Sequence, residues 1–361
     1  MQHTVEFNKT MLIDGPASAR LVSGKAEVFG CPIKVLERIV VREGKRLPFF
    51  AVETAVFDIS LGPNASIAEM IGCTIPTTWN ESVKTILGVQ KRPVIVLILG
   101  AGNSGKSSLC TYLLNNIVDG KCKVAVLDGD LGQSDIGPSA TVGYTLVSKR
   151  LPELYDSKLK NAFFVGVTSP IKSAEKTIEG LATMKNEILQ QQVDFVLVNT
   201  DGWVSGEIAV KFKTAQVSKV KPDIIIGVQM HDELAPLIAS LSIPVIVVES
   251  SSALNERTAE KRRSLREMTY AKFLKNAKLQ CYPKSQVTIE HRNAIPKNQE
   301  PKKGILVGLG GHGNKFLGIG VLREINPVRK VLKVQTAVLA KPSKVIIGKV
   351  VLNEKFQEVQ D

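Results

Sequence analysis

The sequence predicts an α/β core with a parallel sheet, flanked by an N-terminal β-sandwich-like domain and a small C-terminal β domain. Apolar runs alternate with helical patterns over residues 88–280, which is typical of a parallel sheet covered by helices on both faces. The segments before and after show two-residue alternation broken by Gly, Pro and Asn, as antiparallel strands do. We therefore expect three domains in the 361 residues: 1–80, 81–282 and 283–361.

Each domain has its own expected elements. The N-terminal segment holds no long amphipathic pattern before Pro76, which favours a small sandwich. Helical periodicity in the middle region predicts helices over Ser173–Gln191 and Gly206–Val220. Near the C-terminus, the glycine-rich residues 308–313 predict a hairpin turn, because no lysine follows them where a nucleotide loop requires one. The strands of the middle region are expected at Val94–Leu99, Lys123–Leu127, Phe163–Val167, Phe195–Val198, Ile224–Val228 and Val245–Val248.

Composition and charge narrow the classes of function. The first residues lack the basic segment and apolar core of a secretory signal, and no apolar run approaches the roughly 20 residues that span a bilayer. We therefore expect a soluble protein of the cytoplasm. The five cysteines form no C-x-x-C pair, which favours buried thiols over zinc or disulfides. Thirteen Lys or Arg against four Asp or Glu lie between Arg257 and Lys303, so this stretch indicates a polyanionic partner or a solvated charged face.

Residues Gly100–Ser107 spell G-x-x-x-x-G-K-S directly after the first apolar run. A buried strand, a glycine loop and a helix in this order form a P-loop, whose backbone N–H groups and helix N-terminus bind phosphates. Lys106 is expected to contact the β- and γ-phosphates, and Ser107 to offer its hydroxyl to Mg²⁺. The middle domain is therefore predicted to be a P-loop NTPase core. The expected nucleotide-binding residues are Gly100, Ala101, Gly102, Asn103, Ser104, Gly105, Lys106, Ser107 and Ser108.

The second strand ends in an acidic sequence, L-D-G-D-L-G-Q-S-D, over Leu127–Asp135. Ligands of parallel sheets bind at the carboxyl ends of the strands, so Asp128 and Asp130 are expected to meet the triphosphate. One can hold the water shell of the metal, as a Walker B aspartate does, while the other accepts a proton from an attacking hydroxyl. Gln133 can orient the nucleophile or a metal-bound water. The alternative is an Asp-Gly turn that only closes a loop.

Two later strands also end in polar or aromatic residues. Thr168 and Ser169 can donate hydroxyl hydrogen bonds to phosphate, although Ser-Pro is also an ordinary helix entry. Trp203 follows the fourth strand in N-T-D-G-W, where it can stack on a nucleobase or belong to the core. No N-K-x-D sequence follows a late strand, so guanine specificity is not indicated.

The segment 255–274 is rich in arginine and has a helical pattern. Arg262 and Arg266 lie four residues apart and share one helical face, with Arg263 beside them. Such a helix can close over a transferring phosphoryl group and stabilise its charge. A solvated basic helix or a general nucleic-acid patch explains the same pattern, and Arg257 leaves the register of a lid open.

In this combination the chain resembles the polynucleotide 5'-hydroxyl kinase family, which includes cleavage-factor and nucleolar pre-rRNA-processing RNA kinases and compact archaeal members. The resemblance implies a P-loop kinase between two β domains that transfers the γ-phosphate of ATP, with Mg²⁺, to the 5'-hydroxyl of RNA and often of DNA. The compact chain favours the archaeal type. The motifs that carry it are G-P-A-S-A-R-L-V-S-G-K-A-E-V-F-G, the P-loop, D-G-D-L-G-Q-S-D-I-G-P, G-V-T-S-P, N-T-D-G-W-V-S-G, the arginine segment and L-G-I-G-V-L.

The resemblance also implies roles for single residues. Ser107 and Asp128 match metal ligands, and Asp130 is favoured as the base for the 5'-hydroxyl. The matched catalytic residues are Lys106, Asp128, Asp130, Gln133, Arg262 and Arg266. The matched substrate-binding residues, which clasp phosphate or stack on a base, are Thr168, Ser169, Trp203 and Arg263.

Two alternatives to an RNA kinase stay open on the sequence. An ATP-bound scaffold in an RNA-processing complex would keep the P-loop, but a static binder needs neither the acidic pair nor an arginine-rich lid. A kinase of a small metabolite is the second alternative, and the basic excess and Trp203 argue against it. The protein partners are not indicated.

Overall fold

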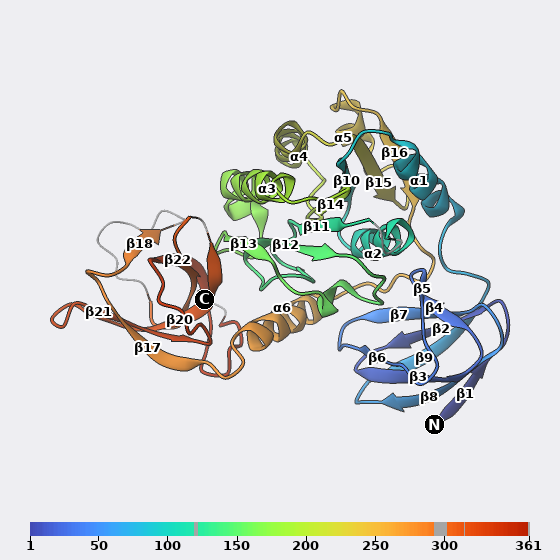
Figure 1. Cartoon of the computed structure of the whole chain (residues 1–361), viewed down its shortest axis with the longest axis horizontal. Helices are drawn as coiled ribbons and strands as arrows, with labels where there is room; N and C mark the ends of the chain where they lie inside the picture. Colours follow the sequence, from blue (N-terminus) through green and yellow to red (C-terminus); the bar gives the residue numbers. More distant parts are fainter. Residues whose placement is uncertain (119–121, 292–301, 314, 360–361) are drawn as a thin grey trace. The chain divides into compact units, whose positions relative to one another are not determined.

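The computed structural model describes residues 1–118, 122–291, 302–313 and 315–359 (Figure 1). The chain divides into two compact units, and the division falls within the predicted middle domain. The first unit consists of Met1–Val126, Leu146–Ser157 and Gln191–Arg262. The second consists of Leu127–Thr145, Lys158–Gln190 and Arg263–Asp361. The domain boundaries expected near residues 80 and 282 stay predictions.

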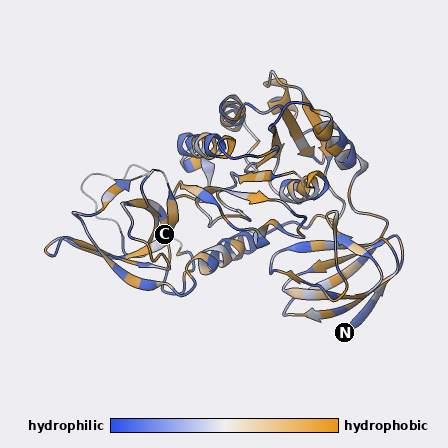
Figure 2. Ribbon diagram, in the orientation of Figure 1, coloured by the Kyte–Doolittle hydropathy of each residue, from blue (hydrophilic) through white to orange (hydrophobic). Residues whose placement is uncertain are grey.

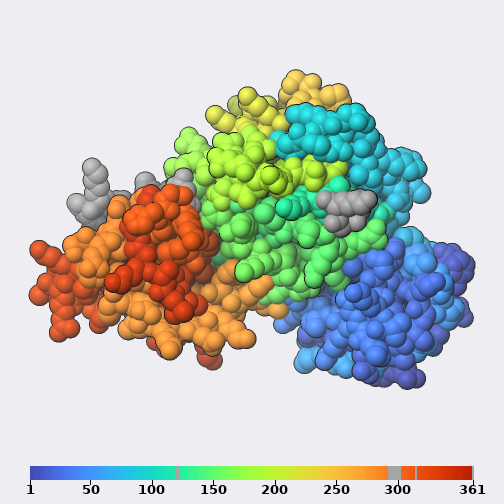
Figure 3. All heavy atoms as spheres, in the orientation of Figure 1, coloured from blue at the N-terminus to red at the C-terminus, as the bar shows by residue number. Residues whose placement is uncertain are grey.

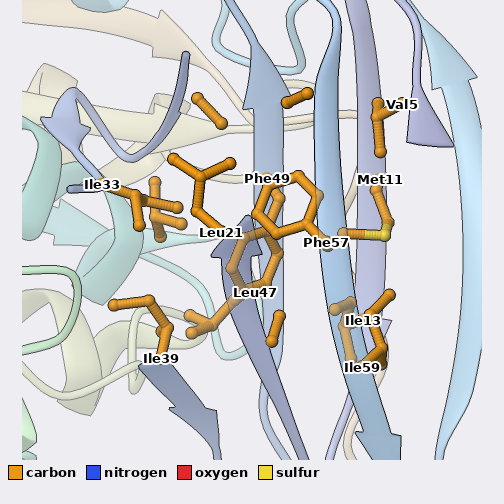
Figure 4. Packing of buried hydrophobic residues seen from close by; sticks show 14 of the residues in the cluster. Val5, Met11, Ile13, Leu21, Ile33, Ile39, Leu47, Phe49, Phe57 and Ile59 are labelled. Atoms are coloured by element: carbon orange, nitrogen blue, oxygen red, sulfur yellow. The ribbon is translucent and has the colours of Figure 1, made fainter. Parts of the chain in front are cut away.

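Two antiparallel sheets form the N-terminal part of the first unit, a closely packed body drawn in blue in Figure 3. One sheet has the order β1 (Gln2–Val5), β8 (Ala55–Leu61), β3 (Ala17–Ser23) and β6 (Arg38–Val41). The other has the order β5 (Cys31–Pro32), β4 (Ala26–Val28), β7 (Arg46–Ala51), β2 (Lys9–Asp14) and β9 (Ser66–Ile71). Side chains from both sheets form one hydrophobic cluster, in which the Phe49 and Phe57 rings meet edge to face (Figure 4).

The remainder of the first unit contains the strands that carry the P-loop. After α1 (Thr77–Gly88), every residue of β10 (Val94–Gly100) is buried, as a strand covered on both faces requires. These strands are largely orange in Figure 2. Parallel pairing gives the order β14 (Phe195–Asn199), β10, β15 (Ile224–Gln229) and β16 (Val245–Glu249). The helices are α2 (Lys106–Ile117), α4 (Glu207–Val220) and α5 (Ala235–Ala239). The predicted α/β P-loop core is thereby confirmed.

The prediction of an all-parallel sheet is wrong at one edge. Strand β11 (Val124–Asp128) was expected, but β12 (Thr141–Val147) was not, and it pairs antiparallel with β13 (Asn161–Phe164). The seven strands have the order β13-β12-β11-β14-β10-β15-β16. Only the short helical turn η1 (Leu154–Asp156) lies between β12 and β13, whereas a parallel pair requires a long crossover, usually a helix. The expected third strand also starts earlier and ends at Phe164, before Gly166 takes a positive φ of 83°.

The second unit also contains helix α3 (Ala174–Leu189), the turn η2 (Pro170–Lys172) and a six-stranded sheet. Its strand order is β17 (Lys278–Pro283), β21 (Val331–Thr336), β20 (Phe316–Asn326), β19 (Ile305–Gly310), β22 (Lys344–Val351) and β18 (Thr288–His291). Because β19 and β20 pair antiparallel, the predicted glycine hairpin is confirmed.

Helix α6 (Ala259–Phe273) begins in the first unit and continues into the second. It contains Arg262, Arg263 and Arg266 of the predicted lid, whereas Arg257 precedes it. Residues 292–301, which belong to the basic stretch noted in the sequence, lie outside the described residues. Among the helices in the described ranges, none is long and apolar enough to cross a membrane.

Candidate active site

The P-loop joins β10 to α2 in the first unit. Gly105 has a φ of 95°, in the left-handed region, immediately before α2 begins at Lys106. Gly100 is required by space, because a Cβ there would lie 2.5 Å from Ser104 Oγ and 2.6 Å from the Val228 carbonyl oxygen. The loop therefore turns tightly into a helix whose first N–H groups have no partner within the helix and can bind an anion.

The side chains of the P-loop fit a triphosphate. Lys106 is 7% exposed, and its Nζ donates a 2.6 Å hydrogen bond to the Ala101 carbonyl of the same loop. Ser104 is 2% exposed, and its Oγ has no hydrogen-bond partner among the described residues, so a phosphate oxygen would satisfy it. Asn199 Nδ2, at the end of β14, lies 3.4 Å from Ser107 Oγ. A serine hydroxyl is the kind of oxygen ligand that Mg²⁺ accepts beside phosphates.

The loop after β14 packs directly on the P-loop. A Cβ at Gly202 would lie 2.6 Å from the Gly102 nitrogen and 2.7 Å from its Cα, so only glycine permits this approach. The adjacent Trp203 is half-buried, and its ring centroid lies 5.3 Å from that of Phe212 in α4, with 32° between the planes. Trp79, the other tryptophan, is fully buried. The structure thus places Trp203 in the same unit as the P-loop, next to the glycine that packs on Gly102.

A further loop, after β16, contacts the P-loop and was missed by the sequence analysis. Ser250 Oγ donates a 2.9 Å hydrogen bond to the Ser104 carbonyl. A Cβ at Gly105 would lie 3.2 Å from Leu254 Cδ2, so this leucine packs against the turn into α2. Serine and leucine in a late loop belong to no phosphate-binding motif, and no sequence signal marks them.

Asp128 is the buried centre of the acidic loop in the second unit. It is 2% exposed, and its two oxygens accept hydrogen bonds from the backbone N–H groups of Asp130, at 3.2 Å, and Asp135, at 3.0 Å. Burial, followed by the charges of Asp130 and Asp135, raises the pKa of Asp128 to about 7. Such a carboxyl can exchange a proton near neutral pH, and a nearby cation would favour its charged form.

Asp130 is half-buried and shapes the rest of this loop. Its Oδ1 accepts hydrogen bonds from the N–H groups of Gly132, at 3.0 Å, and Gln133, at 2.9 Å. Gln133 Nε2 donates to the Gly132 carbonyl at 2.6 Å. A Cβ at Gly132 would lie 2.9 Å from the Thr168 carbonyl, so the loop carrying Thr168 and Ser169 packs on the acidic loop. The aspartates therefore form the turn suggested as an alternative, and they also concentrate carboxylates at the end of β11.

Few side chains of the candidate site can act as ligands to a metal ion. Within the described parts of the chain, no group of three or more His, Cys, Asp or Glu side chains is arranged to hold a metal ion. Mg²⁺ in phosphate-transferring sites usually takes one or two carboxylates, with phosphate oxygens and waters supplying the other ligands. Asp128 and Ser107 fit that requirement by their chemistry.

The arginines of α6 have different surroundings. In the first unit, Arg262 Nη2 lies 3.9 Å from the position that a Cβ of Gly102 would occupy, which places this guanidinium at the P-loop. In the second unit, Arg266 Nε and Nη2 each donate a 2.6 Å hydrogen bond to the Glu358 carboxylate. Arg263 donates to Glu267 at 2.9 Å and to the Glu358 carbonyl. Arg257 lies before the helix.

Arg262 and Arg266 share a helical face in the sequence, yet they meet different partners. Arg262 approaches the phosphate-binding backbone, while Arg263 and Arg266 hold the C-terminal segment. Glu358, the partner of Arg266, lies 92 residues further along the chain, so no local sequence pattern reveals this contact.

The middle part of the chain is similar to known proteins. Residues 100–276 match the family model described as "mRNA cleavage and polyadenylation factor CLP1 P-loop". The polyribonucleotide 5'-hydroxyl-kinase of Pyrococcus furiosus is 29% identical over 215 residues, 60% of each chain. The protein of that name from Methanocaldococcus jannaschii is 30% identical over 207 residues, 57% of this chain and 56% of that one. The matches thus span about 60% of the length of these relatives.

A solved structure extends the likeness along the chain. The fold is similar to that in "Structure of wild-type Clp1p-Pcf11p (454 -563) complex", with a TM-score of 0.78, 14% identity and 97% of both chains covered. At this identity the likeness shows the fold alone. The similarity to the CLP1 P-loop family therefore lies in residues 100–276, and the likeness of the fold extends over nearly the whole chain.

Proposed function

We propose that this protein is an ATP-dependent polynucleotide 5'-hydroxyl kinase, which transfers the γ-phosphate of ATP to the 5'-hydroxyl of RNA. The observation that carries the proposal is the buried acidic loop around Asp128, at the end of a strand in the sheet that also carries an intact P-loop. A protein that only retains ATP does not need such carboxylates. The relatives named polyribonucleotide 5'-hydroxyl-kinase support RNA as the acceptor.

The first unit supplies the groups that hold the donor. Backbone N–H groups of Gly100–Ser107 and the start of α2 bind the phosphates, and Lys106 exchanges its bond to the Ala101 carbonyl for the β- and γ-phosphates. Arg262, beside the P-loop, stabilises the charge that develops on the transferring group. Positioning and charge neutralisation are the main sources of rate in such a transfer.

The second unit supplies the groups for the acceptor. Asp130 accepts the proton of the 5'-hydroxyl while the hydroxyl oxygen forms a bond to the γ-phosphorus. The bond from that phosphorus to the β–γ bridging oxygen breaks, and ADP is released. Gln133 orients the nucleophile, and Thr168 and Ser169 bind the phosphate side of the substrate. Ser107 of the first unit and Asp128 of the second would each offer an oxygen ligand to Mg²⁺, which would neutralise phosphate charge.

Recognition of the acceptor involves a base and the backbone of the nucleic acid. Trp203 stacks on a base near the 5' end, since stacking tolerates any base sequence. The basic stretch beginning at Arg257 contacts the phosphate backbone. DNA is a second acceptor, because it carries the same 5'-hydroxyl. We also propose a cytoplasmic location.

The test is transfer of label from γ-labelled ATP, with Mg²⁺, to a 5'-hydroxyl RNA oligonucleotide. Matched reactions contain the same RNA with a 5'-phosphate, the DNA equivalent and free nucleosides. We expect label on the 5'-hydroxyl RNA and none on the 5'-phosphorylated RNA. No transfer by folded, ATP-binding protein would overturn the proposal in favour of an ATP-bound scaffold, and preferred labelling of nucleosides would favour a metabolite kinase.

A further inference from the structure

We propose that Lys213 is a positioning residue for Trp203, so that a buried ion pair between α4 and the loop after β14 holds the base-stacking residue in place. The inference deepens the proposed kinase function and rests on it for the identity of the stacked group. Asp201 lies within N-T-D-G-W-V-S-G, whereas Lys213 and Phe212 belong to none of the motifs that indicate the activity.

The ion pair between Lys213 and Asp201 is closed to solvent. The side chain of Lys213 is 0% exposed and that of Asp201 is 4% exposed. Lys213 Nζ donates 2.8 Å hydrogen bonds to Asp201 Oδ2 and to the Asp201 carbonyl oxygen. Removing such charges from water costs about several kcal/mol per ion, and apolar residues of similar volume often serve stability as well or better. A role in fixing one conformation accounts for a pair that stability alone does not require.

Asp201 connects Lys213 to Trp203, because its carboxylate is hydrogen-bonded to both residues. Its Oδ1 accepts a 2.9 Å hydrogen bond from the backbone N–H of Trp203. Phe212, the neighbour of Lys213 in α4, contacts the Trp203 ring at 5.3 Å between centroids. Two consecutive residues of one helix therefore hold Trp203, one through its backbone and one through its ring. An indole held before the substrate arrives loses less freedom on binding.

The same loop is anchored to the strand that carries the P-loop. Thr200 Oγ1 donates a 2.8 Å hydrogen bond to the Ile98 carbonyl of β10. Gly202, between Asp201 and Trp203, lies against the Gly102 backbone so closely that a Cβ would come within 2.6 Å of its nitrogen. These two contacts do not involve the ion pair, so they should keep the loop at the P-loop when Asp201 and Lys213 are changed. Loss of the ion pair should therefore affect the position of Trp203 more than the binding of ATP.

The test uses the double variant Asp201→Asn/Lys213→Met, which removes both charges and leaves neither buried alone. We expect the KM for the 5'-hydroxyl RNA to rise about tenfold, within the range that one base-stacking contact contributes, while the KM for ATP changes by less than about twofold. Acrylamide quenching reports Trp203 directly, because Trp79 is fully buried. The quenched fraction of tryptophan fluorescence should increase in the variant.

Two controls separate positioning from simple loss of stability. In a Trp203→Ala background, the same double change should alter the RNA KM by less than about twofold, because its effect acts through the missing ring. The matched control is Arg42→Met/Glu153→Gln, which removes another buried ion pair of the first unit, with side chains 8% and 11% exposed. It should lower the melting temperature without changing the RNA KM.

Unchanged quenching and RNA KM in Asp201→Asn/Lys213→Met would overturn the proposal, as would an equal rise in KM in the Trp203→Ala background. If the double variant does not fold, Lys213→Arg replaces it, since it keeps both charges and changes the geometry of the pair. Failure of the kinase function is distinguishable, because quenching needs no turnover. If the wild-type protein transfers no phosphate, the quenching result alone decides whether Lys213 positions Trp203.

Discussion

The loops that follow β10 and β11 are built from opposite chemistry. The P-loop presents donors: backbone N–H groups, the Lys106 ammonium and the Ser104 hydroxyl. The acidic loop is folded around its own anions, because Asp128 and Asp130 accept hydrogen bonds from the N–H groups of the residues that follow them. The first loop can therefore lose a side chain without losing its shape. In the second loop, a substitution changes both chemistry and conformation.

The largest effect is expected from Lys106→Met in the P-loop. The ammonium donates a hydrogen bond to the Ala101 carbonyl of its own loop, and we expect the fold to survive the substitution. We expect phosphate transfer to fall by about 10²–10³-fold or more, because one preorganised charge facing the transferring group is lost. Label transfer measures the rate, and thermal melting checks the fold. Activity near that of the wild-type protein would show that Lys106 does not face the phosphates.

Two arginines of α6 are expected to have separate effects. Arg262→Ala should lower kcat by about 10²-fold with little change in stability, because this side chain lies at the P-loop. Arg266→Ala should instead lower the free energy of unfolding by about 1–3 kcal/mol, because its partner Glu358 is only 14% exposed. Label transfer and urea unfolding measure the two quantities. Equal loss of kcat without loss of stability in both variants would contradict the separation.

Glu358→Gln provides the matched control for Arg266. It removes the charge but keeps an oxygen for Arg266, so stability should fall by less than in Arg266→Ala. Phosphate transfer at a temperature where the variant is folded should stay near the wild-type rate. A large loss of transfer in Glu358→Gln would indicate that the C-terminal segment contributes to the reaction itself.

The sequence predicts the parts of this molecule that depend on short spacings. The P-loop follows from eight consecutive residues, and strands such as β10 and β14 follow from continuous apolar runs. The partners of Arg266 and Lys213 could not be predicted, because helical spacing tells which residues share a face but not what lies opposite. Strand β12 was missed because T-V-G-Y-T-L-V mixes polar and apolar residues while both faces become buried.

Gly202→Ala is expected to have a smaller effect, on stability and on the binding of ATP. In Gly202→Ala, the new Cβ meets the Gly102 backbone, which cannot move aside as a flexible side chain could. We expect stability to fall by about 1–3 kcal/mol and the KM for ATP to rise, because the P-loop or its neighbour must shift. Gly88→Ala is the matched control, since no atom lies within 4 Å of its added Cβ. Equal stability of the two variants would show that the contact is not tight.

The last prediction concerns the pH dependence of the acidic loop. Burial raises the pKa of Asp128 from 3.8 to about 7, so between these values the native protein holds a proton that the unfolded chain releases. Stability from this group is complete below pH 4 and is lost as the pH rises to about 7, with a slope of at most about 1.4 kcal/mol per pH unit. In metal-free protein, urea unfolding at a series of pH values should show this fall.

Asp128→Asn isolates that slope from the other titrating groups. The amide has no proton to release in this range, so the variant should lose the downward slope, although one backbone N–H loses its acceptor and stability shifts by a constant amount. The difference in slope between the two proteins is therefore the decisive quantity. Parallel curves would contradict the raised pKa. Added Mg²⁺ should flatten the wild-type curve and leave the variant unchanged, because a cation at the carboxylate favours its charged form.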